Sequence, residues 1–166
     1  CILRDTGHIL GSASVRIKDE HGVALAITGD IGNAPSPYLS DPQPVEDADV
    51  LVMESVYGDR VNPQEGRVEI LQKALQEARV RGGPILIPAF SIERTQLMLY
   101  EISNLMEAGA IPKIPVFLDS PLAIKVTDVY AKWSGEYFKP EVGDELKLER
   151  DIFRFPFLTQ TRSRED

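Results

Sequence analysis

The spacing of apolar residues changes along this chain, and that change limits the folds that the chain can adopt. Residues 13–18 alternate apolar and polar side chains, the turn sequence Asp19-Glu20-His21-Gly22 follows, and residues 23–28 read as a second strand. Together they predict a β-hairpin. Val50-Leu51-Val52-Met53 is a short apolar run and predicts a buried strand. We therefore expect the first third of the chain to form part of a β-sheet.

After about residue 60, the apolar residues recur at helical spacing instead. Three helices and two short buried strands are expected, the helices over residues 64–79, 91–107 and 122–133 and the strands over 85–87 and 116–118. Helices that alternate with short strands are typical of a parallel sheet, so we expect these two strands to run parallel. The fold class that the sequence predicts is therefore α/β. No firm element is predicted between residues 139 and 166.

The expected helix over residues 122–133 has a well-formed amphipathic pattern. Its apolar residues recur three or four positions apart, as they do on one side of a helix. They are Leu122, Val126, Val129, Tyr130 and Trp133.

The composition is that of a folded, acidic chain. Hydrophobic residues make up 43% and charged residues 27%, which excludes intrinsic disorder as the main state. The net charge of −8 argues against a protein that coats nucleic acid non-specifically, but it is compatible with a local basic groove. No run approaches the roughly 18 apolar residues of a membrane span, so no membrane partner is expected. One cysteine excludes an internal disulfide and favours a cytoplasmic, reducing compartment.

Three polar residues stand next to expected strands and could carry chemistry. His8 lies between two glycines before the hairpin, Asp30 follows a strand and a glycine, and Glu54 ends the apolar run at residues 50–53. Such a histidine can bind a metal or carry a proton, and such carboxylates can bridge metals or orient a base. Each also has a plainer explanation: a turn histidine bonded to backbone, an aspartate that caps a turn, and an acid at the sheet edge.

Taken together and in order, the segments that contain these residues resemble a known family. GHILGSA around His8, TGD around Asp30 and ESVYGDR from Glu54 onward resemble three successive motifs of the metallo-β-lactamase superfamily, β-CASP branch. PAFSIERTQ at residues 88–96 and LDSPLA at residues 118–123 resemble two later segments of the β-CASP domain. Each motif is weak, but five in the right order are specific. The branch contains nucleases that process RNA, such as ribonuclease J, and the DNA-processing nuclease Artemis.

The resemblance implies a domain organisation. Residues 1–58 would be the C-terminal part of the first metallo-β-lactamase half, and so part of an αββα sheet. Residues 59–166 would be the N-terminal part of the inserted β-CASP domain, a parallel, Rossmann-like unit.

The resemblance also implies a reaction, the hydrolysis of RNA phosphodiester bonds with two zinc ions. His8 matches the histidine that ligates one zinc, and Asp30 matches the aspartate that bridges both. Asp30 and Glu54 are the catalytic residues that the resemblance implies. Glu54 matches the acidic residue at the start of the β-CASP domain, which hydrogen-bonds a later histidine that assists the leaving group. Two zinc ions roughly 3.5–4 Å apart can hold a hydroxide and clamp the phosphate oxygens.

RNA is the partner that the resemblance implies, with Ser91 and Arg94 as candidate substrate-binding residues. Arg94 has an alternative explanation, a salt bridge on an exposed helix face. The sequence departs from the common family pattern at Val56 and Asn62, neither of which matches a metal ligand.

Most of the family's ligand histidines are not in this sequence. The family's centre uses a His-x-His-x-Asp-His cluster, a further upstream histidine and two downstream ones, whereas this chain has two histidines in all and begins with Cys1. We therefore expect an internal part of a longer ribonuclease, which alone holds no dinuclear zinc centre and cleaves no RNA. The complete protein would act in RNA processing or decay, as a homodimer or within a complex.

The sequence also allows two other functions. One is a β-CASP subunit that has lost catalysis and serves as a scaffold in an RNA-processing complex. The other is a different hydrolase of the superfamily, such as a thioesterase or a lactonase, against which the helix–strand alternation after Glu54 argues.

Overall fold

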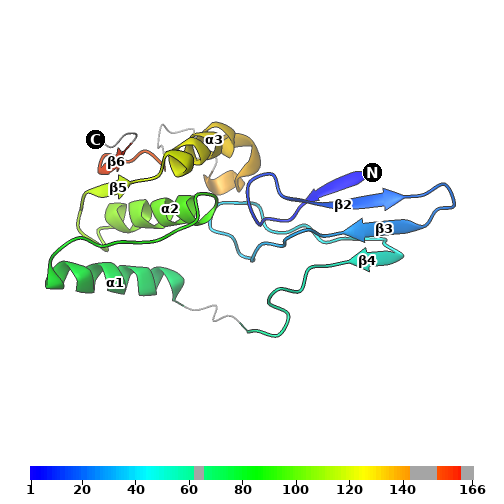
Figure 1. The fold of residues 1–166 in the computed structure, drawn as a ribbon, viewed down its shortest axis with the longest axis horizontal. Helices are drawn as coiled ribbons and strands as arrows, with labels where there is room; N and C mark the ends of the chain where they lie inside the picture. Colours follow the sequence, from blue (N-terminus) through cyan, green and yellow to red (C-terminus); the bar gives the residue numbers. More distant parts are fainter. Residues whose placement is uncertain (62–65, 143–152, 162–166) are drawn as a thin grey trace. The chain divides into compact units, whose positions relative to one another are not determined.

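The computed structural model describes residues 1–61, 66–142 and 153–161, and the chain divides into two compact units (Figure 1). The first unit comprises Cys1–Val61 and Trp133–Glu145, and the second comprises Asn62–Lys132 and Leu146–Asp166. The expected α/β fold class is confirmed. The assignment of residues 1–58 and 59–166 to parts of two domains stays a prediction.

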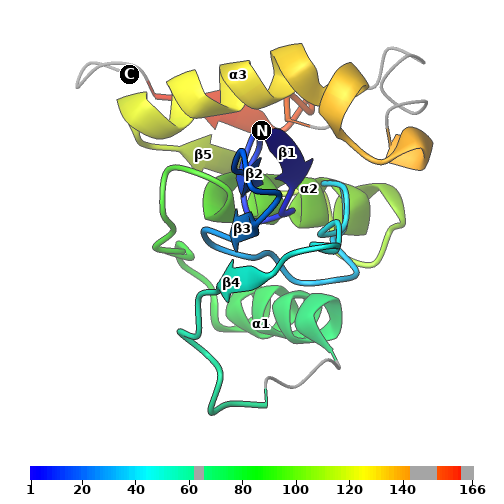
Figure 2. The ribbon, with the colours of Figure 1, turned by 90° about the vertical axis from the view of Figure 1, so that its right-hand side faces the viewer.

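The first unit contains a four-stranded sheet in the order β1 (Ile2–Asp5), β2 (Ala13–Lys18), β3 (Ala24–Ile27) and β4 (Val50–Val52). Figure 2, which looks along the strands, shows them following one another in that order. β2 is antiparallel to both β1 and β3, so the predicted hairpin is confirmed, and β4 is parallel to β3. Consequently, the β1–β2 loop and the C-terminal ends of β3 and β4 lie at the same end of the sheet.

β4 was expected to be a buried strand, and that prediction is wrong. Val50, Leu51 and Val52 are each about half exposed. The physical reason is that β4 is an edge strand: among the residues described, it pairs with β3 alone. An apolar run predicts a strand correctly here, but not the layer that would cover it.

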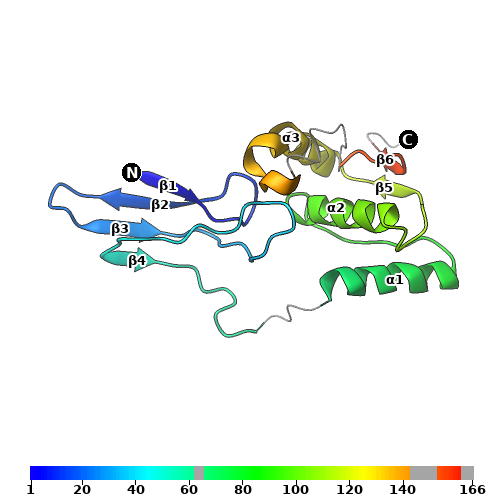
Figure 3. The same ribbon diagram turned by 180° about the vertical axis from the view of Figure 1, so that it is seen from behind.

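The second unit contains α1 (Arg67–Arg81), α2 (Arg94–Glu107), β5 (Val116–Leu118), most of α3 (Pro121–Tyr137) and β6 (Leu158–Gln160). α2 lies between α1 and α3 in Figures 1 and 3. It supplies the largest share of the core, with buried Leu97, Leu99, Ile102, Leu105 and Met106. No helix in the described ranges is long and apolar enough to cross a membrane.

The strand expected over residues 85–87 does not form, and its predicted burial is also wrong. Leu86 is 92% exposed, and Ile85 and Ile87 are partly exposed. A strand needs a neighbour to accept its backbone hydrogen bonds. β5 instead pairs in parallel with β6, which lies in the stretch where no element was predicted. The parallel pairing expected for β5 is therefore made with a different partner.

The helix boundaries differ slightly from those expected. α1 begins at Arg67 and ends at Arg81, whereas the prediction was 64–79; residues 64 and 65 lie outside the described part of the chain, as does Asn62. α2 begins at Arg94 instead of residue 91, because Glu93 has φ 61° and ψ −56°, which is incompatible with a helix.

α3 buries a different face from the one that its apolar stripe marks. Leu122 is 61% exposed, and Val129 and Trp133 are also exposed, whereas Tyr130 is buried. The buried face consists mostly of small or polar side chains: Ala123, Ile124, Thr127, Tyr130 and Ser134. Thr127 faces α2, where the Gln96 amide donates a hydrogen bond to its hydroxyl at 2.8 Å.

The segment after α3 completes the first unit. The Tyr38 and Phe138 rings lie 4.9 Å apart between centroids, and the Lys139 backbone N–H donates to the Tyr38 carbonyl at 2.8 Å. The Lys139 ammonium lies 2.9 Å from the Asp41 carboxylate. The hydrogen bond from Lys139 and a second from the Ser36 backbone lower the pKa of Asp41 below its usual value.

Candidate functional site

The β1–β2 loop carries His8 at this end of the sheet, and hydrogen bonds within the loop close it. The Thr6 backbone N–H donates to the Ser12 carbonyl at 3.2 Å, and the Ser12 N–H donates to the Ile9 carbonyl at 3.0 Å. The Ser12 hydroxyl oxygen also accepts from the backbone N–H groups of His8 and Ile9, at 3.1 and 3.2 Å. The main chain of His8 is therefore fixed by groups within the same loop.

The loop after β3 carries Asp30 and packs directly on the β1–β2 loop. The Gly32 backbone N–H donates to the Thr6 carbonyl at 2.8 Å. A Cβ atom on Gly32 would lie 2.0 Å from the Gly7 carbonyl oxygen, so only glycine allows the two backbones to approach this closely. The contact brings the loops of His8 and Asp30 together.

The two side chains face each other across this contact. His8 Nε2 lies 3.6 Å from Asp30 Oδ2, and the side chains are 39% and 72% exposed, respectively. Two donors bound to one zinc ion at about 2.0–2.1 Å in tetrahedral geometry are about 3.3 Å apart. The imidazole nitrogen and the carboxylate oxygen thus have the chemistry and the spacing of two ligands that share a zinc ion.

Glu54 lies beside this pair, at the end of β4. Its Oε2 accepts from the Val56 backbone N–H at 2.9 Å, and its Oε1 accepts a longer hydrogen bond, 3.4 Å, from the N–H of Ile31. The Glu54 N–H donates to the buried Thr28 hydroxyl at 3.2 Å. These bonds join the end of β4 to the Asp30 loop, so His8, Asp30 and Glu54 all lie at the same end of the sheet.

Ser91 and Arg94 lie in the second unit, where the chain enters α2. The Gln96 amide, which is fully buried, donates to the Ser91 carbonyl at 3.2 Å. Arg94 is exposed, and its side chain makes no hydrogen bond or ion pair with the residues that the structure describes. The salt bridge that was the alternative explanation of Arg94 is thus not made within those residues.

The chain does not supply a complete set of metal ligands in its described ranges. No group of three or more histidine, cysteine, aspartate or glutamate side chains could hold a metal ion there. The roles of His8, Asp30, Glu54, Ser91 and Arg94 stay predictions. The residues that hold the two loops, Ser12, Thr28 and Gly32, were not among the predicted site residues. The signal for Ser12 and Thr28 was their place within the GHILGSA and TGD segments.

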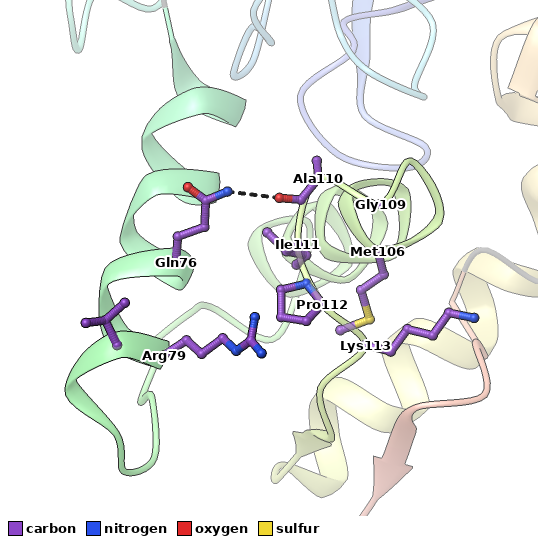
Figure 4. Close-up of a pocket in the computed structure, with 9 residues that line it drawn as sticks. Gln76, Arg79, Met106, Gly109, Ala110, Ile111, Pro112 and Lys113 are labelled. Atoms are coloured by element: carbon purple, nitrogen blue, oxygen red, sulfur yellow. Dashed lines mark hydrogen bonds between the residues drawn. The ribbon is translucent and has the colours of Figure 1, made fainter.

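A pocket of about 680 Å³ lies elsewhere in the second unit, between α1 and the turn after α2 (Figure 4). The Gln76 side chain reaches across it and donates to the Ala110 carbonyl at 3.0 Å, and Arg79 points toward Pro112. The buried side chains of Met106 and Ile111 also line it. The pocket contains none of the predicted site residues.

Residues 95–166 match the family model of the Beta-Casp domain. The chain belongs to the β-CASP family of the metallo-β-lactamase superfamily, as its ordered motifs indicated.

The relatives of the chain include three proteins whose similarity extends over most of it. Ribonuclease TTHA0252 of Thermus thermophilus is 35% identical over 149 residues, which cover 89% of this chain and 34% of that protein. The RNase J-like protein of Methanocaldococcus jannaschii is 32% identical, over 78% of this chain and 31% of that protein. The transcription termination factor FttA of Thermococcus kodakarensis is 30% identical, over 86% and 23%. The chain thus spans about a third or less of the length of these relatives.

Proposed function

We propose that this chain is part of a zinc-dependent ribonuclease that hydrolyses RNA phosphodiester bonds in RNA processing or decay. The observation that carries the proposal is the distance of 3.6 Å between His8 Nε2 and Asp30 Oδ2, where two loops meet at one end of the sheet. The names of two similar proteins, a ribonuclease and an RNase J-like protein, support RNA as the substrate. A cytoplasmic location and assembly into a homodimer or an RNA-processing complex are part of the same proposal.

Zinc would be held by the His8 imidazole and the Asp30 carboxylate, with further ligands from parts of the complete protein outside this chain. When bound, zinc ions supply an activated water and positive charge for the phosphate oxygens. The packing of Gly32 on Gly7 holds the two donors close together, so the chain would contribute two prearranged ligands.

Glu54 would act through hydrogen bonds and not as a metal ligand. Its Oε2 is engaged by the Val56 N–H at 2.9 Å, whereas the bond to Oε1 is long, at 3.4 Å. Oε1 is therefore the atom that can accept a second donor, such as the histidine that the family places beside it. A carboxylate in that position keeps an imidazolium protonated and ready to deliver a proton to the leaving oxygen.

Arg94 would bind an RNA phosphate. An exposed guanidinium with no partner among the described residues can form a bidentate, charge-assisted pair with phosphate oxygens. Ser91, three residues earlier at the same turn, would contribute to the same contact.

The test uses the complete protein, purified with zinc, and measures both zinc content and cleavage of a single-stranded RNA. Asp30→Ala and His8→Ala are each expected to lower zinc content and to abolish cleavage. Because Asp30 is 72% exposed, its variant should remain folded. The matched control is Glu20→Ala, which removes a carboxylate that is 88% exposed in the hairpin turn and should change neither quantity. Normal zinc content and normal turnover in Asp30→Ala would refute the proposal.

A further inference from the structure

One hydroxyl group organises the loop that carries His8. The Ser12 Oγ lies within hydrogen-bond distance of three donors: the Thr6 hydroxyl at 2.9 Å and the N–H groups of His8 and Ile9 at 3.1 and 3.2 Å. Side-chain oxygens of this kind fix a turn by pairing backbone donors that would otherwise need water. Here, one of the paired donors belongs to the candidate zinc ligand itself.

The same loop also holds the partner of His8. Thr6, whose hydroxyl donates to Ser12, accepts the N–H of Gly32 through its carbonyl at 2.8 Å. Thr6 is almost fully buried, at 3% exposed, so it has little freedom to follow a displaced loop. A continuous set of hydrogen bonds therefore runs from the His8 main chain through Ser12 and Thr6 to the loop of Asp30.

Loss of the Ser12 hydroxyl would leave the N–H groups of His8 and Ile9 without their side-chain acceptor. The backbone bonds between Thr6, Ile9 and Ser12 would still close the loop. The fold should thus survive, but the His8 main chain would be free to rotate toward water. The imidazole would then no longer be held 3.6 Å from the Asp30 carboxylate.

We propose that Ser12 is a positioning residue for zinc binding, which fixes the His8 imidazole relative to the Asp30 carboxylate. The proposal rests on the proposed function, in which His8 is a zinc ligand. Ser12 makes no contact with zinc or RNA in this scheme; it acts through His8. Residues that orient a metal ligand through hydrogen bonds commonly change metal affinity by about 10–100-fold when they are removed. Because Ser12 holds the main chain and not the ring, we expect the lower end, about tenfold.

The experiment measures zinc affinity of the complete protein by competition with a chelating dye, apart from any assay of cleavage. Ser12→Ala should weaken zinc binding about tenfold, and added zinc should restore RNA cleavage. A residue that took part in the reaction itself would not be rescued by zinc. Unfolding in urea, followed for each variant, separates a local change from a loss of the fold.

Ser14→Ala is the matched control. Ser14 is buried in β2, and its hydroxyl donates to the Arg4 carbonyl at 3.3 Å, so the variant also loses one serine hydrogen bond. Its zinc affinity should stay unchanged. An equal loss of affinity in Ser14→Ala and Ser12→Ala would overturn the proposal, because general destabilisation would then explain both.

His8→Ala separates this inference from the proposed function. If His8→Ala weakens zinc binding but Ser12→Ala does not, Ser12 is no positioning residue and the zinc role of His8 stands. If His8→Ala leaves zinc affinity unchanged, the proposed function fails, and the role of Ser12 fails with it.

Discussion

Gly32 shows how a residue without a side chain sets the geometry of the site. The Cα atom of Gly32 lies against the backbone of Gly7 and His8, and its N–H donates to Thr6. The chemistry of the site is carried by His8 and Asp30, but their separation depends on this backbone contact. Any substitution at position 32 must push the two loops apart.

Gly32→Ala should therefore destabilise the chain by about 1–3 kcal/mol, the usual cost of forcing a methyl group into a packed site. The reason is the 2.0 Å distance between the added Cβ and the Gly7 carbonyl oxygen. Urea unfolding measures the change. Gly135→Ala is the control: a Cβ there meets nothing within 4 Å, and alanine in a helix should stabilise by about 0.5–1 kcal/mol. An equal or greater stability of Gly32→Ala would contradict the packing.

Residue types explain which parts of the site could be predicted. His8, Asp30 and Glu54 could be selected from the sequence because each lies in a segment that resembles a motif of the β-CASP branch, and the segments occur in the family's order. Gly32 could not, because its contribution is a contact with the backbone of Gly7 and His8 in another loop. That contact exists only once two loops, about twenty residues apart in sequence, are folded against each other.

At the scale of elements, α3 shows what a hydrophobic pattern leaves open. Apolar side chains occur on both sides of this helix, and the structure buries the side that carries Ala123, Ile124 and Tyr130 together with the polar Thr127. Small side chains let helices approach closely, and the Gln96–Thr127 hydrogen bond uses that proximity. Counting apolar positions predicted the helix correctly but not the face that it buries.

Two substitutions in α3 test which face belongs to the core of the described structure. Ile124→Ala should destabilise by about 2–5 kcal/mol, since Ile124 is 3% exposed and its removal leaves a cavity. Leu122→Ala should change stability by less than about 0.5 kcal/mol, because Leu122 is mostly exposed. Thermal or urea unfolding of the two variants gives the comparison. A larger loss for Leu122→Ala would show that the apolar stripe is the packed face after all.

The strands also show that an apolar run alone does not decide whether an element forms. The run Ile85-Leu86-Ile87 has the composition of a buried strand, but strand formation also requires a partner with free backbone groups. β5 has such a partner in β6, some forty residues later in the chain. Pairing between distant segments is set by the whole fold, which local spacing does not encode.

At the scale of the molecule, the chain enters the first unit twice. Residues 133–142 return to it after the second unit has begun, and the Phe138 ring packs on Tyr38, which is fully buried. The two contiguous regimes of the sequence pattern predicted a change of architecture near residue 60. The return could not be predicted, because nothing local in residues 133–145 distinguishes a partner in one unit from a partner in the other.

The ion pair between Asp41 and Lys139 should make the stability of the contact between Lys139 and the first unit sensitive to acid. The pKa of Asp41 is lowered, mainly by its hydrogen bond with Lys139, so the folded state favours the ionised carboxylate. This contribution to stability is present above the ordinary pKa of 3.8 and is lost as the pH falls through the lower pKa of the folded state. Asp41→Asn should therefore be less stable than the original chain at pH 7, with a difference that shrinks below pH 3.8.

Urea midpoints at pH 7, pH 4 and pH 2 measure this difference. Asp59→Asn is a suitable control, since the Asp59 carboxylate meets Arg60 only at 3.7 Å and both side chains are largely exposed. A constant difference between Asp41→Asn and the original chain across the three pH values would contradict the assignment.

The return of the chain to its first unit also has a consequence for synthesis on the ribosome. The Ser40 hydroxyl donates to the carbonyl of Tyr137, 97 residues further along, and Phe138 covers Tyr38 next to it. At typical translation rates, that distance corresponds to about 5–20 seconds. During this interval Tyr38 lacks the Phe138 ring, while α1 and α2 have already been made. Helices need mainly local contacts, so α1 and α2 can form before the first unit is finished.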